Sequence, residues 1–388
     1  MELTTDLIRR REKLQQSMKA AGVEACVIAT NVNLYYLSGM IFGGYLFLPA
    51  EGEPLYFVKR PSGLKDPRVV YIRKPEDIPD QLGKRNIPLP GSLGLEGDLL
   101  SYNDYIRLQA VFNPQKTINI TPLLRKIRSV KSDREIDQFR ISARKHSEAY
   151  SKIRSCYFPG MTDVEFQACI EKEMRMLGSI GYFRGFGNNM EIHMGSILTG
   201  DNAEAPSPFD FALGGKGMHP SIPIGADGSI LQEGHSVMVD MAGNYTAYIT
   251  DMTRTFAIGK LPDLAYKAHR VSLDIQNEII KISKPGTSCA ELYNLSLAMA
   301  EAAGLSSYFM GTSQQAKFVG HGVGIEINEL PILTGRSKEV LEPGVVFALE
   351  PKFVLPGIGA VGIENTFLVT SGGLEKLTLF EEEIIPLT

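Results

Sequence analysis

The pattern of apolar and polar positions divides the chain into alternating helices and strands. Residues 5–21 have apolar side chains at helical spacing, and residues 25–29 form a short apolar run typical of a buried strand. Three further apolar runs, separated by glycine, proline and charged residues, follow before residue 122. This part of the chain is therefore expected to form a small α/β domain.

A polar, basic stretch follows, and a new helix is expected to begin after it. Ser132 and Glu135 have the S-x-x-E spacing of a capping box, in which each side chain bonds the backbone of the other at a helix N-terminus. A chain of 388 residues also exceeds what a single hydrophobic core usually covers. We therefore expect two domains, residues 1–127 and residues 128–388.

The second domain contains one order of elements twice. Two helices precede two strands that carry Asp240 and Asp251, and two more helices precede two strands that carry Glu350 and Glu364. The helices are expected at residues 133–155, 162–176, 263–282 and 288–303. Such a duplication places a site between the two halves, with one pair of carboxylates from each half.

The connection between the first two strands decides where their acids lie. A two-residue turn at residues 243–244 would leave Asp251 roughly 13 Å from Asp240 along the strand. Two metal ions about 3.5–4 Å apart cannot share acids at that separation. We therefore expect a longer connection centred near residues 245–246, which sets Asp240 directly opposite Asp251.

The length of the connection between the next two strands likewise sets the relative positions of Glu350 and Glu364. A two-residue turn at residues 356–357 would send Glu350 and Glu364 to opposite faces of the strands. A three-residue loop at residues 356–358 pairs them directly. We expect the three-residue loop.

Four acids and one histidine thus belong to apolar, strand-like runs. Burying an ionised carboxylate without a partner costs several kcal/mol, so an acid in such a run ordinarily faces solvent. That explanation serves for any one acid, but four acids in four runs indicate shared cations. Two divalent ions neutralise four carboxylates, and a single histidine leaves coordination positions open for water. The expected ligands are Asp240, Asp251, His321, Glu350 and Glu364.

A centre of this kind predicts hydrolysis. A metal-bound water can lose its proton with a pKa of about 7, which provides a hydroxide nucleophile at neutral pH. Oxygen-rich ligation with one imidazole suits Mn(II), Co(II), Fe(II) or Zn(II), and manganese is our first expectation for the two ions.

Composition narrows the range of partners. A net charge of −4 gives no electrostatic reason to expect nucleic acid or an anionic membrane. No apolar run approaches the roughly 18 residues of a membrane span, and the charged N-terminal segment lacks the apolar core of a signal peptide. The four cysteines lie far apart, which argues against a disulfide framework. We expect a cytoplasmic protein that acts on a peptide or a small molecule.

The motifs together resemble the metallopeptidase family that includes methionine aminopeptidases, Xaa-Pro aminopeptidases and prolidases. The matching runs are DMAGNYTAYITDMTRTF, GHGVGIEINELP, ALEPKF and GIENTF, in the family's order and spacing. The run REKLQQSMKAAGVEACVIATNVNLYYLSG is similar to the creatinase-type N-terminal domain of the proline-specific members. The resemblance implies an α/β N-terminal domain, an α+β pita-bread catalytic domain with an internal pseudo-twofold repeat, and a homodimer.

The resemblance also implies a role for each ligand. Asp240 would chelate one metal ion, and Asp251 and Glu364 would bridge the two. His321 and Glu350 would hold the other ion, and Glu350 would accept the proton of the attacking water. The implied activity is that of an Xaa-Pro aminopeptidase or dipeptidase, which separates an N-terminal residue from proline by means of a metal-bridging hydroxide.

Two positions depart from the family pattern. In the peptidases a histidine directly precedes the glutamate that corresponds to Glu329, and this chain has Asn328 there. Asparagine can donate a hydrogen bond to a developing oxyanion but cannot transfer a proton. A second family histidine is replaced by Ser207 in GDNAEAPS, while His219 lies closer to the family's distance from the first metal-binding aspartate. His219 and Asn328 are both kept as candidate catalytic residues, and residues 207–223 as an insertion beside the substrate pocket.

Two other functions stay open. The same metal site could act on a small non-peptide substrate as an amidohydrolase or lyase, which the two missing histidines favour. A catalytically silent binding protein on the same fold is the third possibility, and five intact ligands argue against it. Among the remaining polar residues, Arg254 is expected either to pair with a site carboxylate or to face solvent. The other histidines are expected to be structural or exposed; they are His146, His193, His235 and His269.

Overall fold

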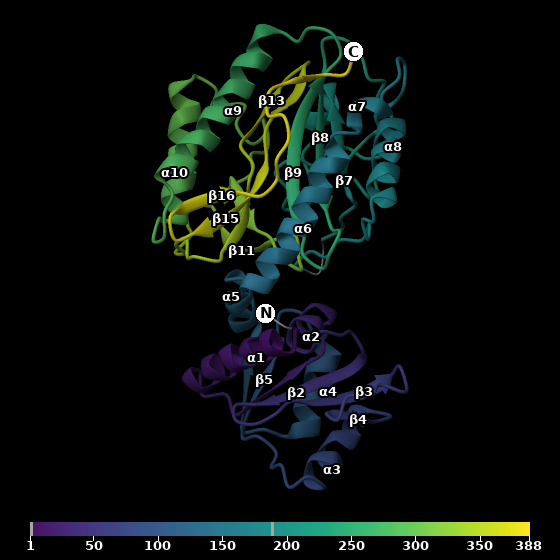
Figure 1. Cartoon of the computed structure of the whole chain (residues 1–388), viewed down its shortest axis with the longest axis vertical. Helices are drawn as coiled ribbons and strands as arrows, with labels where there is room; N and C mark the ends of the chain where they lie inside the picture. Colours follow the sequence, from purple (N-terminus) through teal and green to yellow (C-terminus); the bar gives the residue numbers. More distant parts are fainter. Residues whose placement is uncertain (1–2, 188–189) are drawn as a thin grey trace. The chain divides into compact units, whose positions relative to one another are not determined.

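Contacts within the chain divide it into two compact units, Met1–Arg128 and Ser129–Thr388. The computed structural model describes residues 3–187 and 190–388, and Figure 1 draws the first unit in purple to blue and the second in teal to yellow. Among these described residues, no helix is long and apolar enough to cross a membrane.

The first unit is built on one mixed sheet of six strands in the order β4-β3-β2-β1-β5-β6. The strands are β1 (Ala25–Ile28), β2 (Gly43–Pro49), β3 (Leu55–Arg60), β4 (Val69–Tyr71), β5 (Ser92–Leu95) and β6 (Lys116–Asn119). The helices are α1 (Leu3–Ala20), α2 (Asn31–Ser38), α3 (Ile78–Gly83), α4 (Tyr102–Phe112) and α5 (Thr121–Ser129). Phe47, Phe57 and Phe112 belong to its buried core. The expected α/β domain is confirmed.

In each half of the second unit, helices precede the strands beside the site acids, as the sequence predicts, with additional short elements between them. The first half contains α6 (Asp133–Tyr150), α7 (Ile153–Cys156), α8 (Asp163–Met176), β7 (Gly195–Thr199), β8 (Ser236–Gly243) and β9 (Thr250–Ala257). The helices of the second half are α9 (Asp263–Ile282) and α10 (Cys289–Ala302). Its strands are β10 (Gly320–Gly322), β11 (Glu329–Ile332), β12 (Val346–Leu349), β13 (Lys352–Leu355), β14 (Gly359–Gly362), β15 (Asn365–Thr370), β16 (Gly373–Lys376) and β17 (Ile385–Pro386).

Side-chain caps fix where the helices of this unit begin. Ser132 and Glu135 form the predicted capping box at the start of α6. The helix ends earlier than expected, at Tyr150, and α7 follows as a separate turn. The Ser151 hydroxyl donates to the Glu148 carbonyl at 2.6 Å, a local bond that competes with continuation of the helix.

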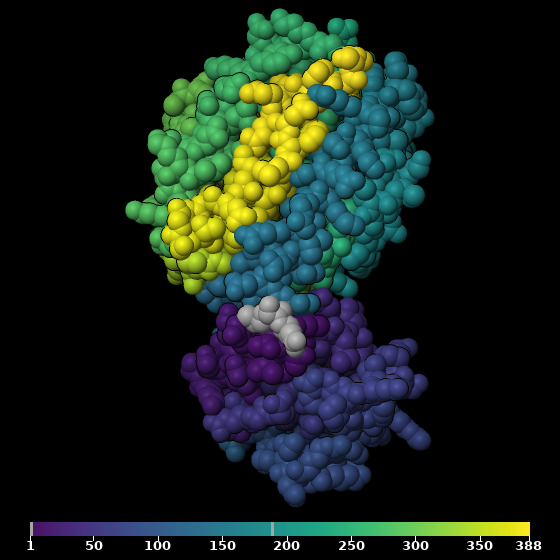
Figure 2. Space-filling view, viewed as in Figure 1, coloured from purple at the N-terminus to yellow at the C-terminus, as the bar shows by residue number. Residues whose placement is uncertain are grey.

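The strands of this unit form three sheets, in the orders β17-β9-β8-β7, β11-β10-β12-β15-β16 and β13-β14. In Figure 1, α6, α7 and α8 flank the strands on one side and α9 and α10 on the other. Figure 2 shows the C-terminal segment, in yellow, crossing the surface of this unit between the two groups of helices. Most of these strands are buried, including β9, β12, β13 and β14, in which every residue is buried.

The pairing of β8 with β9 corrects one prediction. Asp240 pairs with Thr253, and Asp251 pairs with Ala242, so the two acids are not directly opposite each other. The loop is displaced because α6 holds it: the Ser142 hydroxyl donates to the Tyr248 carbonyl at 2.9 Å. The displacement amounts to two residues, which leaves both acids on the same face of the strands.

The second pair of acids is placed as expected. Leu355 pairs with Gly359, so the connection between β13 and β14 has the three residues 356–358. Leu349 pairs with Asn365 in the same register. Glu350 and Glu364 therefore lie across from each other between the two ladders.

Candidate metal centre

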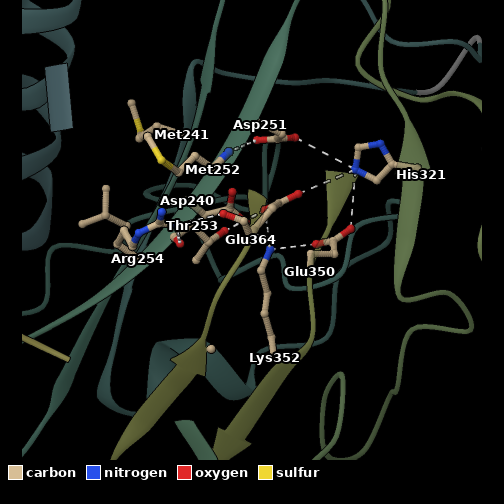
Figure 3. Close-up of polar contacts among 12 residues, drawn as sticks. Asp240, Met241, Asp251, Met252, Thr253, Arg254, His321, Glu350, Lys352 and Glu364 are labelled. Atoms are coloured by element: carbon tan, nitrogen blue, oxygen red, sulfur yellow. Dashed lines mark hydrogen bonds and ion pairs between the residues drawn. The ribbon is translucent and has the colours of Figure 1, made fainter. Parts of the chain in front are cut away.

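The structure brings all five predicted ligands to one place (Figure 3). Asp240 lies in β8, Asp251 in β9 and His321 in β10. Glu350 directly follows β12, and Glu364 directly precedes β15 and bridges to Thr253 of β9. Asp251, Glu350 and Glu364 are 8%, 3% and 1% exposed. Each half of the unit thus contributes two acids to a common buried site.

His321 faces three of the four carboxylates. Its Nε2 lies 3.4 Å from an oxygen of Glu350 and 4.0 Å from oxygens of Asp251 and Glu364. Its Nδ1 lies 3.2 Å from the Gly322 carbonyl oxygen, which can only accept, so a hydrogen bond there places the proton on Nδ1. The Nε2 lone pair then points at carboxylate oxygens. That arrangement is repulsive unless a proton or a metal ion lies between them.

One oxygen of Glu364 supports the same conclusion. Its Oε2 accepts from the Thr253 hydroxyl at 2.7 Å, whereas its Oε1 is buried and has no hydrogen-bond partner in the described structure. Buried oxygens of this kind are ordinarily paired with a donor or a metal ion. Ligand atoms of Asp251, His321 and Glu364 lie within 4.8 Å of one another, as a shared ion requires. These residues fit a divalent cation.

The charges of the acids are incompletely balanced by the described side chains. Burial, and then the charge of Asp240, raises the pKa of Asp251 well above its ordinary value. Burial, and then the charge of Asp251, raises the pKa of Glu364 in the same way. A divalent ion would favour the ionised form of both groups.

The sequence analysis missed a sixth member of the site. The Nζ of Lys352 lies 2.8 Å from Asp240, 2.7 Å from Glu350 and 3.1 Å from Glu364, and its side chain is 0% exposed. Burial lowers the pKa of this ammonium, but attraction to the three carboxylates outweighs burial and raises the pKa well above its ordinary value. Figure 3 shows the lysine rising from β13 into the acids.

A signal for this lysine was present in ALEPKF. Residues two apart in an extended segment share a face, so this spacing places Lys352 on the side of Glu350. A lysine in an apolar run is as costly to bury as an acid. The run ALEPKF therefore predicts a lysine among the charges of the site.

The two candidate catalytic residues both bond other parts of the chain. Both side-chain amide atoms of Asn328 bond the backbone of Phe186, with Oδ1 accepting at 2.6 Å and Nδ2 donating at 3.0 Å. His219 is exposed, and its Nδ1 lies 2.8 Å from the Ser221 hydroxyl. Ser207 is buried, and its hydroxyl accepts from the Phe209 amide at 3.1 Å. The contacts of Asn328 thus serve to anchor the segment around Phe186.

The segment from 207 to 223 borders a cavity. The cavity has a volume of about 220 Å³, and its lining includes Ser207, Phe209 and Phe211 from this segment and Gln314 from the second half. The Gln314 amide donates to the Ser207 carbonyl at 2.9 Å, which ties the segment to the second half of the unit.

Arg254 takes neither of its two expected positions. It is 0% exposed and donates to the backbone carbonyls of Thr253, Glu364 and Glu381 at 2.8, 2.9 and 2.6 Å. It therefore holds the backbone beside the site rather than a site carboxylate. The histidines lie as expected: His146 and His269 are buried, His235 is partly exposed and His193 is exposed.

Known proteins of similar sequence and structure agree with this site. Residues 137–371 match Metallopeptidase family M24, and residues 10–130 match the Creatinase/Prolidase N-terminal domain. An Xaa-Pro dipeptidase of Pyrococcus furiosus is 27% identical over 386 residues, which cover 97% of this chain and 99% of the relative. An Xaa-Pro dipeptidase of Pyrococcus horikoshii is 27% identical over 380 residues, which cover 96% and 98%.

Solved structures show the same fold over the whole chain. An Xaa-Pro dipeptidase from Bacillus anthracis superposes with a TM-score of 0.81 at 24% identity, covering 98% of this chain and 99% of its own. The prolidase from Pyrococcus horikoshii gives a TM-score of 0.78 at 24% identity, covering 97% and 100%. The pita-bread architecture with a creatinase-type N-terminal domain is therefore confirmed. Because the family match spans more than half of the sequence and includes every acid of the site, the chain belongs to metallopeptidase family M24.

Proposed function

We propose that this M24 metallopeptidase is an Xaa-Pro dipeptidase or aminopeptidase, which cleaves the bond between an N-terminal residue and proline. The observation that carries the proposal is the convergence of four acids and His321 from both halves of the unit on one buried position. The names of the relatives support the choice of substrate, since several are Xaa-Pro dipeptidases.

The residues of the site would have three roles: binding the ion, accepting a proton and orienting a ligand. Asp251, His321, Glu350 and Glu364 would hold a divalent ion, which when bound supplies a Lewis acid and lowers the pKa of a coordinated water. Glu350 is 3% exposed, and we propose it as the group that takes the proton from the attacking water. Thr253 donates to Glu364 at 2.7 Å and so keeps that carboxylate oriented.

Three finer properties belong to the same proposal. We propose Mn(II) as the preferred ion, because oxygen-rich ligation with one imidazole suits it. We propose a homodimer, by the family resemblance alone. We propose the cytoplasm as the compartment, since Cys26 and Cys289 are buried as small apolar side chains, the role that cysteine takes in a reducing environment.

A small non-peptide amide or related compound is the second candidate substrate. The observation that favours it is the pairing of Asn328 with the Phe186 backbone at both amide atoms. An amide held in this way is directed at the chain rather than at a developing oxyanion, and it cannot transfer a proton. A substrate with a better leaving group than a peptide amine needs less of that assistance.

The first test is hydrolysis of a panel of Xaa-Pro dipeptides and longer Xaa-Pro peptides by the purified protein with Mn(II). We expect release of the N-terminal residue, and a loss of at least about a hundredfold in kcat/KM in the Asp251→Ala variant, because the loss of a ligand disrupts the ion. Lys145→Ala, which changes an exposed lysine of α6, serves as the matched control and should keep full turnover. No release from a protein that binds metal would favour the non-peptide substrate.

A further inference from the structure

We infer that the ammonium of Lys352 takes the place of one of the two cations, so that the centre binds one divalent ion tightly beside His321 and a second only by displacing the lysine. The inference rests on the metal site proposed above and concerns how many ions that site holds. It assigns Lys352 as a built-in cation of the centre, a role that neither the family match nor the relatives' names provide.

The two glutamates divide their oxygens between the lysine and the histidine. Glu350 directs Oε2 to the Lys352 ammonium at 2.7 Å and Oε1 to His321 Nε2 at 3.4 Å. Glu364 directs Oε2 to the ammonium at 3.1 Å and Oε1 to His321 Nε2 at 4.0 Å. Both carboxylates therefore bridge two cation positions, and Lys352 occupies one of them.

Asp240 belongs to the position that the lysine occupies. Its Oδ2 lies 2.8 Å from the Lys352 ammonium. Asp251, by contrast, belongs to the group of ligand atoms around His321. A metal ion bound to Asp240 and to Glu364 Oε2 would lie about 2.0–2.2 Å from these oxygens. Because the ammonium already contacts the same two oxygens, the ion and the ammonium exclude each other there.

Repulsion between cations favours one ion with the lysine in place. The four carboxylates carry four negative charges, and the ammonium with one divalent ion supplies three positive charges. A second divalent ion beside the ammonium would raise the total to five, with three cations close together in a buried site. Such repulsion is strong where water is excluded.

The lysine is also held in position along its stem. Lys352 is 0% exposed, and its backbone pairs with Gly362 across the β13–β14 ladder. A Cβ at Gly362 would come within 3.1 Å of the Lys352 Cγ, so the lysine stem fills the space beside this glycine. An ammonium in such a setting can leave the acids only if its stem moves. The second ion must therefore bind much more weakly than the first.

The first experiment counts ions on the unaltered protein. The full chain is dialysed to equilibrium against graded Mn(II), and bound manganese per chain is measured by elemental analysis. We expect one ion at low free Mn(II) and a second only at concentrations at least roughly tenfold higher, the factor given by one charge-assisted hydrogen bond. Two ions bound with equal affinity would overturn the inference. This count needs no variant, so a folding defect cannot obscure it.

The second experiment removes the ammonium while keeping the length of the side chain. In Lys352→Met we expect the second Mn(II) to bind roughly 10- to 100-fold more tightly than in the unaltered protein, since no internal cation competes. Lys376→Met is the matched control, because Lys376 pairs with Glu382 in the same unit, and it should leave both affinities unchanged. An unchanged second affinity in Lys352→Met would contradict the inference.

Hydrolysis is measured separately on the same samples, so the two proposals fail in different ways. One tight ion without release of any residue from Xaa-Pro peptides would leave the role of Lys352 standing and overturn the proposed substrate. Two ions bound with equal affinity, together with release of the N-terminal residue from Xaa-Pro peptides, would overturn the role of Lys352 and leave the proposed substrate standing. No bound ion in any of the three proteins would contradict both.

Discussion

Arg254 shows how a single buried charge supports the site without touching a carboxylate of it. Its guanidinium donates to the carbonyls of Thr253 and Glu364 and to the Asn365 side chain at 2.9 Å. It also reaches the C-terminal segment through the Glu381 carbonyl. Burial lowers its pKa to about 10, which still leaves it charged at neutral pH. Only a planar group with several fixed donors can satisfy this set of acceptors.

The substitution Arg254→Lys should therefore destabilise the protein. Lysine keeps the charge but has no rigid fork, so buried carbonyl oxygens lose their donors, at a cost of about 2–4 kcal/mol in the free energy of unfolding. Denaturant titration followed by circular dichroism measures the change. Arg140→Lys is the matched control, since the Arg140–Glu375 pair is at the surface, and we expect a change of at most about 0.5 kcal/mol there. Equal losses in the two variants would refute this account of Arg254.

At the scale of elements, the packing of α6 on β9 buries a histidine in its neutral form. His146 of α6 is 0% exposed, and its Nδ1 lies 3.0 Å from the Thr250 hydroxyl of β9. Burial lowers the pKa of His146 from 6.5 to about 3. The unfolded chain therefore binds a proton between these values and the folded protein does not. The associated stability is complete above pH 6.5 and decreases as the pH falls toward 3.

This histidine predicts an acid sensitivity. Between pH 7 and pH 5, His146 should account for a loss of about 2 kcal/mol in the free energy of unfolding, because protonation then favours the unfolded chain. Glutamine does not titrate, so between pH 7 and pH 5 the free energy of unfolding of His146→Gln should fall by about 2 kcal/mol less than that of the unaltered protein. Denaturant titration at the two pH values measures the difference. A His146→Gln protein with unaltered pH dependence would contradict the assignment.

How well each element was predicted depended on whether its determinants are local. The start of α6 was predicted correctly, because its capping box joins two residues only three positions apart, Ser132 and Glu135. The register of β8 and β9 depends on the bond from Ser142 of α6 to the distant Tyr248, and it was missed. Short-range patterns cannot reveal contacts made across the fold.

In the candidate site, too, some residues were predicted from the sequence and others were not. Asp240 and His321 were found because buried strands seldom carry such residues without a partner, and the fold brings them together with the other acids. Lys352 was missed, although its spacing from Glu350 places the two side chains on one face. The use of Asn328 as an anchor for Phe186 could not be predicted, since 142 residues separate them in the sequence.

For the molecule as a whole, the duplicated arrangement explains why the site lies where it does. Each half of the second unit contributes helices, and its strands carry or border two of the four acids. Helices flank these strands in Figure 1, and the C-terminal segment crosses one face of the unit in Figure 2. Asp251, Glu350 and Glu364 are buried, so little water surrounds them. Such a setting strengthens electrostatic interactions with a bound cation and makes unpaired acids costly. The fold thus favours a metal centre between its halves.

The most direct test of a metal centre between the halves is anomalous diffraction from crystals of the full chain grown with Mn(II). We expect a strong manganese peak among His321, Asp251, Glu350 and Glu364, with the Lys352 ammonium still bonded to Asp240. A map from crystals that contain manganese but show no peak beside His321 would contradict the account.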